Sequence, residues 1–182
     1  KYVSEALTKI GISHKKEVGD TGVLAIIRGD QHTTDQACVG LRADLDALPI
    51  QEENDIDCKS TVDGVMHACG HDVHTSSLLG TAIILHELRG EFEGTVKLIF
   101  QPGEERIPGG AKLMIEAGVL QNPTPINIIG QHVYPELEAG KVGFKSGMYM
   151  ASADELHVKV IGKGGHAALP HKTIDPILIA SH

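Results

Sequence analysis

Short apolar runs rich in β-branched residues alternate along the chain with segments of helical periodicity. The strand-like runs are residues 22–27, 37–41, 95–100 and 126–132, and helical spacing occurs at the N-terminus and in residues 75–88 and 109–117. We expect the first two runs to pair with each other and residues 126–132 to form a buried strand. Strands that alternate with helices predict an α/β fold, a sheet with helices on its faces.

Side chains that can bind a metal ion or transfer a proton follow these apolar runs. Asp44 and Asp46 come after the second run, Glu104 and Glu105 after the third, and His132 ends the fourth. In sheets of this kind ligands collect beyond the carboxyl ends of the strands, so we expect the five side chains to share one site. Taken singly, each has an ordinary alternative: turn residues, an exposed acidic pair, or a core histidine with a satisfied hydrogen bond.

Residues 66–74 hold three histidines, one cysteine and one aspartate within nine positions. So many nitrogen and sulfur donors are costly to bury unless something coordinates their lone pairs. If the segment is extended, Cys69 and His71 project to the same side and can bind one ion together. The stretch therefore indicates a metal site.

Three other interpretations of this stretch were weighed. A zinc-protease helix would use His67 and His71, but the glutamate after the first histidine is absent and Gly70 lies between them. A structural zinc site needs paired ligand clusters, whereas Cys38 and Cys58 are isolated. Surface histidines without a ligand are the third alternative. A catalytic metal site is the interpretation that we favour.

Composition limits the possible partners. The chain has 182 residues and a net charge of −8, and its 16 basic residues are scattered, which argues against nucleic acid as a partner. No apolar run approaches the roughly 20 residues that a membrane span needs. Three cysteines, an odd number at irregular spacing, suit a reducing compartment, so we expect a cytoplasmic protein.

The character of the sequence changes near residue 152. Residues 140–145 are expected to form a short strand, and the alternating apolar residues after 155 another. A glycine-rich loop around His166 follows, and a helix is expected to begin at residues 175–176. We therefore predict one domain in residues 1–151 and the opening of a smaller second domain in residues 152–182. Helix-like patterns run into both termini, so the chain looks truncated at both ends.

Five segments occur in an order and spacing typical of one enzyme family. They are residues 42–49, 67–72, 101–105, His132 and 164–171. With them the sequence resembles the dinuclear metal-dependent aminoacylase and carboxypeptidase family. The similar branch holds hippurate hydrolase, auxin–amino acid conjugate hydrolases and N-acetyldiaminopimelate deacetylase. The resemblance implies a zinc-exopeptidase-like catalytic domain with a mixed sheet, followed by an α+β lid and dimerisation domain.

The resemblance also implies roles for individual residues. Metal ligands would be Cys69, His71, Glu105 and His132, and a further histidine ligand would come from beyond residue 182. Glu104 would be the general base, while Asp46 and His166 would also serve catalysis, the latter by steadying the oxyanion of a neighbouring site. The wider family has a His-x-Asp pair where this chain has Asp44-Leu45-Asp46. This departure leaves open whether Asp44 binds metal.

The implied reaction is hydrolysis of the amide bond of an N-acyl amino acid or short peptide. It would use two divalent ions, with zinc, manganese, cobalt or nickel all compatible with the donors. A homodimer formed through the lid domain is implied for the full-length protein. An exopeptidase of the same family and an inactive metal-binding fragment remain as alternative functions.

Overall fold

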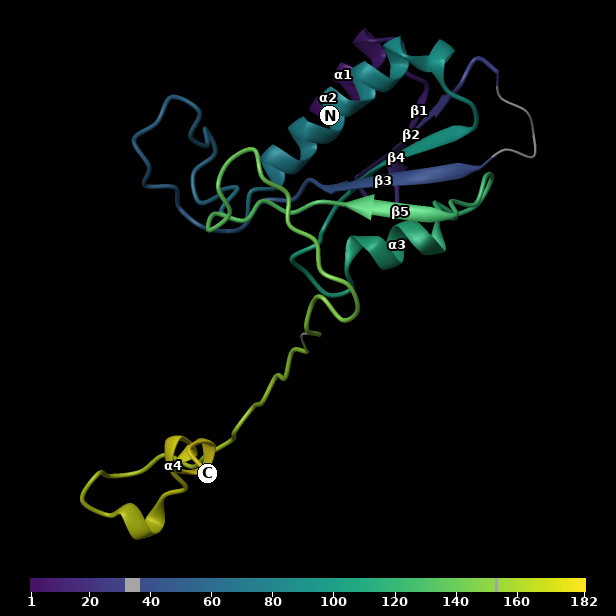
Figure 1. The fold of residues 1–182 in the computed structure, drawn as a ribbon. Coiled ribbons are helices and arrows are strands. Elements are labelled where there is room, and N and C mark those ends of the chain that lie inside the picture. Colours follow the sequence, from purple (N-terminus) through teal and green to yellow (C-terminus); the bar gives the residue numbers. More distant parts are fainter. Residues whose placement is uncertain (32–36, 153) are drawn as a thin grey trace. The chain divides into compact units, whose positions relative to one another are not determined.

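The computed structural model describes residues 1–31, 37–152 and 154–182. They form two compact units, unit 1 (Lys1–Glu136) and unit 2 (Leu137–His182). The domain boundary at residues 151/152 stays a prediction, and Ala153 beside it lies outside the described residues. Unit 1 contains the sheet and all the described strands, and unit 2 contains short helical turns (Figure 1).

One mixed sheet forms the centre of unit 1 (Figure 1). Its strands are β1 (His14–Val18), β2 (Gly22–Arg28), β3 (Cys38–Asp44), β4 (Thr95–Gln101) and β5 (Asn127–Gly130). Their spatial order is β1-β2-β4-β3-β5, with β2 antiparallel to β1 and β4, and β3 parallel to β4 and β5. The predicted α/β fold with a mixed sheet is confirmed. The expected pairing of β2 with β3 is wrong, because β4 lies between them and bonds to both.

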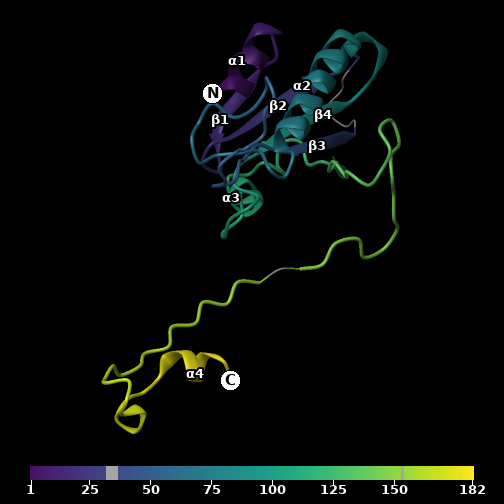
Figure 2. The ribbon, with the colours of Figure 1, turned by 90° about the vertical axis from the view of Figure 1, so that its left-hand side faces the viewer.

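Helices cover both faces of the sheet. Helices α1 (Tyr2–Lys9) and α2 (His71–Glu87) lie on one face and α3 (Gly110–Glu116) on the other, as two perpendicular views show (Figures 1 and 2). A 3₁₀ turn, η1 (Arg89–Glu91), follows α2. Within the described residues, no helix combines the length and apolar content that crossing a membrane requires.

Strand β4 contributes to the core on both faces of the sheet. Leu98 and Phe100 are fully buried in the cluster beneath α1 and α2. Lys97 is also fully buried, and its Nζ donates to the carbonyls of Val119 (2.9 Å) and Gln121 (2.6 Å) just after α3. The charge is thus tolerated inside because two backbone acceptors receive its hydrogen bonds.

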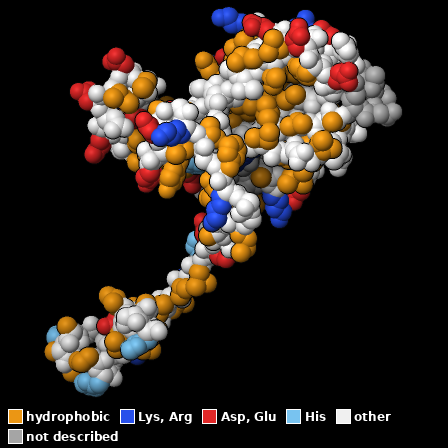
Figure 3. All heavy atoms as spheres, viewed as in Figure 1, with side chains coloured by type: hydrophobic (Ala, Val, Ile, Leu, Met, Phe, Trp, Pro, Cys, Tyr) orange, Lys and Arg blue, Asp and Glu red, His pale blue; other side chains and the backbone are white. Residues whose placement is uncertain are grey.

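Strand β5 is exposed, although residues 126–132 were expected to be buried. All its residues are exposed, including Ile128 at 49 % and Ile129 at 59 %. Hydrophobic side chains are visible on this side of unit 1 (Figure 3). The expectation failed because an apolar strand is buried only where another element covers it, which its own sequence does not specify.

Unit 2 contains the turn η2 (Pro170–Lys172) and the helix α4 (Pro176–Ala180). Asp175 caps α4 by accepting from the backbone N–H of Ile177 at 2.9 Å, so the predicted helix start is confirmed. Lys163 and Ile174 form an isolated antiparallel bridge that closes the glycine-rich loop. In the described part of unit 2, residues 140–145 and the alternating segment after residue 155 are not strands, contrary to expectation.

Candidate metal centre

Three parallel strands end at one edge of the sheet, and the predicted donors follow them there. Strand β3 ends at Asp44, β4 at Gln101 and β5 at Gly130. Helix α2 begins at His71 against the end of β3, because Thr75 Oγ1 donates to the carbonyl of Asp44 at 2.8 Å. The expected convergence of distant segments is therefore present in the structure.

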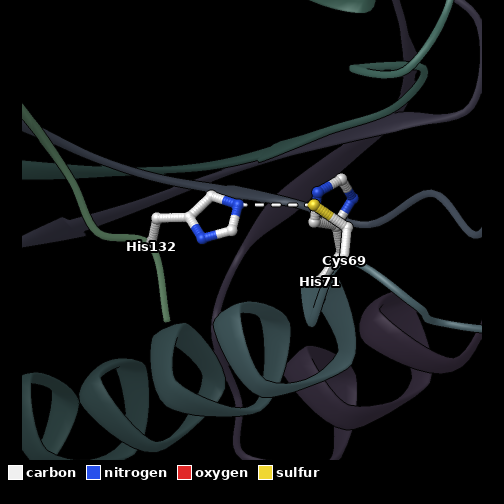
Figure 4. A group of neighbouring side chains, drawn as sticks. All are labelled: Cys69, His71 and His132. Atoms are coloured by element: carbon white, nitrogen blue, oxygen red, sulfur yellow. Dashed lines mark hydrogen bonds between the residues drawn. The ribbon is translucent and has the colours of Figure 1, made fainter. Parts of the chain in front are cut away.

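Cys69, His71 and His132 lie together at this edge (Figure 4). Cys69 Sγ is 3.4 Å from His132 Nε2, and the imidazole centroids of His71 and His132 are 6.2 Å apart. One ligand atom from each of the three residues lies within 4.8 Å of the others. This spacing suits a shared metal ion, so the geometry is compatible with the predicted ligand set.

The chain bends between Cys69 and His71, so the extended conformation expected there is wrong. Gly70 has a left-handed φ of 91°, and α2 starts at the next residue. A Cβ on Gly70 would lie 2.5 Å from Val133 Cγ2, closer than side-chain carbons approach. Glycine is needed at this position for both the turn and the close packing.

The side chain of His71 provides the clearest sign of a cation site. It is 1 % exposed, and its Nδ1 donates to the carbonyl of Asp46 at 3.0 Å. Its Nε2 is buried without a hydrogen-bond partner among the described residues. Carboxylate oxygens of Asp44, Glu104 and Glu105 lie 3.7, 3.9 and 3.9 Å from this nitrogen. A lone pair facing three carboxylates beyond hydrogen-bond range fits a site for a divalent cation.

The two glutamates differ in how they are held. The backbone N–H of Glu105 donates to Asp46 Oδ2 at 3.0 Å, and its carboxylate interacts with the thiol of Cys69. Burial, that interaction with Glu105 and the charge of Glu104 raise the pKa of Cys69 from 9.0 to about 11. The Glu104 side chain is 43 % exposed, against 30 % for Glu105. Glu104 is thus the more accessible carboxylate.

Asp44 is buried at the end of β3, and its carboxylate accepts hydrogen bonds from two side chains. Its Oδ1 accepts from His74 Nδ1 at 2.6 Å and its Oδ2 from Arg42 at 2.8 Å. Burial acts to raise the pKa of Asp44, but the hydrogen bond from His74 and the charge of Arg42 outweigh it and lower the pKa. Sequence reasoning gave Arg42 and His74 no role. For His74 a signal was available, since it lies one helical turn after His71.

His166 belongs to unit 2, whereas the residues described above belong to unit 1. Its side chain is exposed, and its Nδ1 accepts from the backbone N–H of Ala168 at 3.1 Å. Gly165 next to it packs against Thr173, where a Cβ would lie 2.6 Å from Cγ2. The catalytic role assigned to His166 stays a prediction.

A cavity of about 580 Å³ opens beside Asp46 and Glu105. Its lining is mostly apolar with an ion pair on one side, and comprises Asp20, Thr21, residues 45–49, Pro102, Gly103, Glu105 and Arg106. Arg106 and Asp20 form that ion pair. The volume is in the range of small-molecule sites, so the cavity has room for a small molecule next to the candidate metal-ligating residues.

Residues 40–180 match the model of peptidase family M20/M25/M40. This segment includes every candidate residue discussed above. The chain belongs to this family. The expected resemblance is therefore confirmed at the level of the family, whose members include metal-dependent hydrolases.

Similar members of the M20/M25/M40 family come from bacteria and plants. The chain is 49 % identical over 160 residues to N-acetylcysteine deacetylase of Bacillus subtilis, covering 88 % of this chain and 40 % of that one. It is 49 % identical over 182 residues to IAA-amino acid hydrolase ILR1-like 4 of Arabidopsis thaliana, covering 100 % of this chain and 40 % of that one. The chain thus spans less than half the length of these relatives.

A solved structure of the M20 family has the same fold. The YXEP protein of Bacillus subtilis, described as a dinuclear metal binding peptidase, superposes with a TM-score of 0.73 at 44 % identity. The match covers 80 % of this chain and 40 % of that one. The arrangement of helices around the mixed sheet is therefore that of the family.

Proposed function

We propose that the full-length protein is a metal-dependent amidohydrolase that cleaves the amide bond of N-acyl amino acids. The observation that carries the proposal is the buried His71 Nε2, which has no hydrogen-bond partner among the described residues and faces three carboxylates beside Cys69 and His132. The names of the relatives support the substrate class, since one is an N-acetylcysteine deacetylase and another an IAA-amino acid hydrolase.

In this proposal Cys69, His71, Glu105 and His132 hold two divalent cations. When bound, such a pair lowers the pKa of water and polarises the amide carbonyl. The thiolate of Cys69 favours zinc or cobalt, while imidazole and carboxylate also accept manganese or nickel. Asp46 orients His71 through its backbone carbonyl, which fixes the proton on Nδ1 and leaves Nε2 free to bind.

Glu104 serves as the general base. Its neighbour Glu105 is tied by its N–H to Asp46 and by its carboxylate to Cys69, whereas Glu104 has the more exposed carboxylate. Glu104 takes a proton from the attacking water and passes it to the leaving amine. The apolar wall of the cavity beside Glu105 receives the acyl group or side chain of the substrate.

Replacement of Glu104 tests this assignment. In the full-length protein, Glu104→Gln should lower kcat by about 10² to 10⁴-fold while bound metal, measured by elemental analysis, stays at the wild-type level. Glu105→Gln should instead lower the metal content. Glu116→Gln, an exposed change in α3, is the matched control and should alter neither. Wild-type turnover by Glu104→Gln would rule out its role as base.

An exopeptidase is the alternative function, because the family description and the YXEP description both name peptidases. A panel of N-acetyl and N-benzoyl amino acids set against dipeptides separates the two. Higher kcat/KM on the acylated amino acids supports the amidohydrolase. Higher values on the dipeptides support the exopeptidase.

We further propose a cytoplasmic homodimer. The candidate ligand Cys69 needs a reducing compartment to stay a thiol, and the three cysteines are free. Dimerisation would involve the domain that begins in residues 152–182, with His166 acting at the active site of the partner subunit. Sedimentation of the full-length protein and the kcat of His166→Ala test these two points.

A further inference from the structure

We propose that His74 is a positioning residue of the metal centre and is not one of its ligands. It would hold the ends of β3 and β5 in place through a single fixed tautomer of its imidazole. The inference rests on the metal centre proposed above, but its main test does not require metal to bind. It is not obvious from distance alone, since His74 lies within ligand range of Asp44 and His71.

Both nitrogens of His74 have partners inside the protein. The side chain is fully buried in the second turn of α2, and the backbone N–H of Val133 donates to its Nε2 at 2.9 Å. A backbone amide can only donate, so Nε2 carries a lone pair and the proton of a neutral ring sits on Nδ1. From there it is donated to Asp44 Oδ1 at 2.6 Å. His74 therefore has no lone pair left for a cation.

The two proposed histidine ligands, His71 and His132, use their ring nitrogens differently from His74. His71 Nδ1 donates to the carbonyl of Asp46 at 3.0 Å, and His132 Nδ1 donates to the carbonyl of Val133 at 2.7 Å. A carbonyl only accepts, so in both rings the proton is on Nδ1, and Nε2 faces the centre. In His132 this Nε2 lies 3.4 Å from Cys69 Sγ, and in His71 it has no hydrogen-bond partner within the part of the chain that the structure describes. Only in His74 does a backbone N–H occupy Nε2.

The contacts of His74 connect segments that carry other members of the centre. Asp44 ends β3, and Val133 directly follows the candidate ligand His132. The imidazole centroids of His74 and His132 are 4.5 Å apart, and those of His74 and His71 are 5.4 Å apart. His74 thus fixes the backbone beside His132 from a helix that begins with His71. Loss of these bonds should loosen the ligands without removing one.

Imidazole ¹⁵N NMR of the full-length protein tests the tautomer directly. In the metal-free protein we expect the imidazole of His74 to carry its proton on Nδ1, with the ring resonances assigned through the scalar couplings that link them to the His74 backbone. Adding zinc should change the Nε2 resonances of His71 and His132 and leave the tautomer of His74 unchanged. A proton on Nε2 of His74, or ¹¹³Cd–¹⁵N coupling to His74 in the cadmium-loaded protein, would overturn the proposal.

Zinc titration of variants provides a second readout. His74→Asn keeps a donor near Asp44, and His74→Gln keeps an acceptor near the N–H of Val133. Both should keep the wild-type zinc stoichiometry but bind about 10–100-fold more weakly, the usual effect of losing such a supporting hydrogen bond. His71→Asn, the matched ligand variant on the same helix, should lose one equivalent. The same loss in the His74 variants would make it a ligand.

The two proposals fail in different ways. If the full-length protein binds no divalent cation, the proposed function is wrong, while the tautomer in the metal-free protein still decides how His74 is held. If metal binds and the acylated substrates are cleaved, but the proton of His74 is on Nε2, only the positioning role is wrong. Should both variants fail to fold, the NMR result on the unaltered protein still gives the answer.

Discussion

Metal binding at Cys69 should release a proton, and its affinity should therefore rise with pH. Burial, the interaction with Glu105 and the nearby charge of Glu104 raise the pKa of Cys69 to about 11 in the metal-free site. At pH 7 about one thiol in 10⁴ is then ionised, against about one in 10² for the ordinary value of 9.0. Because a metal binds the thiolate, each binding event must remove this proton.

The expected slope follows from the single proton that Cys69 releases when a cation binds to it. Between pH 7.5 and 9.5 the Cys69 thiol stays protonated until metal binds, so the zinc association constant should rise about tenfold per pH unit. From pH 7.5 to 9.5 this is a gain of about 100-fold. Competition with a chromophoric chelator, corrected for the chelator's own protonation, measures the constant. Calorimetry in buffers of different ionisation enthalpy counts the protons released.

Two variants make this test specific. Cys69→Ser should lose the slope, since a serine hydroxyl does not ionise in this range. Cys58→Ser, which alters an exposed thiol, should keep it. A wild-type slope equal to that of Cys69→Ser would refute the reasoning, because it would mean that Cys69 is not the ligand or is already ionised without metal.

Further predictions concern the support of the site. The lowered pKa of Asp44 means that its ionised form stabilises the fold above about pH 4 and that this contribution is lost as pH falls through the folded-state pKa. The urea midpoint should thus fall more steeply on acidification in the wild type than in Asp44→Asn. Lys97→Met should lower the free energy of unfolding by about 2–4 kcal/mol, since two carbonyls lose a charged donor; an unchanged urea midpoint would contradict this. Gly110→Ala would place a Cβ 1.6 Å from the carbonyl oxygen of Pro102. The loop with Glu104 must then move, and kcat should fall by about 10²-fold, while unaltered kinetics would show that the loop adapts.

The sequence was sufficient to predict that the candidate donors converge, because they follow apolar strands. Asp44, Glu104 and His132 each come just after a run that forms a strand, and the three strands are parallel. Parallel strands end at one edge, so the convergence required no knowledge of distances. The family resemblance added the roles proposed above for these residues.

The order of the strands could not be predicted from local patterns. Strands β2 and β3 are neighbours in sequence, but β4, which begins at Thr95, lies between them in space. This order is set by packing between distant segments, and so is the exposure of β5. Lys97 is a related case, because its burial depends on carbonyls that lie beyond α3.

The hydrogen bonds of His74 could likewise not be predicted from the sequence. The stretch that contains it was identified as rich in donors, yet composition does not distinguish a ring with a free lone pair from one without. The turn at Gly70 could not be predicted from the sequence either. It replaced the expected extended segment by a helix start, which places His74 one helical turn after His71, where its Nδ1 donates to Asp44 Oδ1.

The parallel pairing of β3 with β5 has a consequence for how the centre forms during folding. Cys69 Sγ and His132 Nε2 are 3.4 Å apart in the register that pairs Leu41 with Ile129, and a slip of one residue would turn every side chain of β5 to the opposite face of the sheet. A cation that needs both ligands would bind only the correctly aligned chain. Bound metal would then stabilise the aligned form relative to the slipped forms, because only the aligned form binds it.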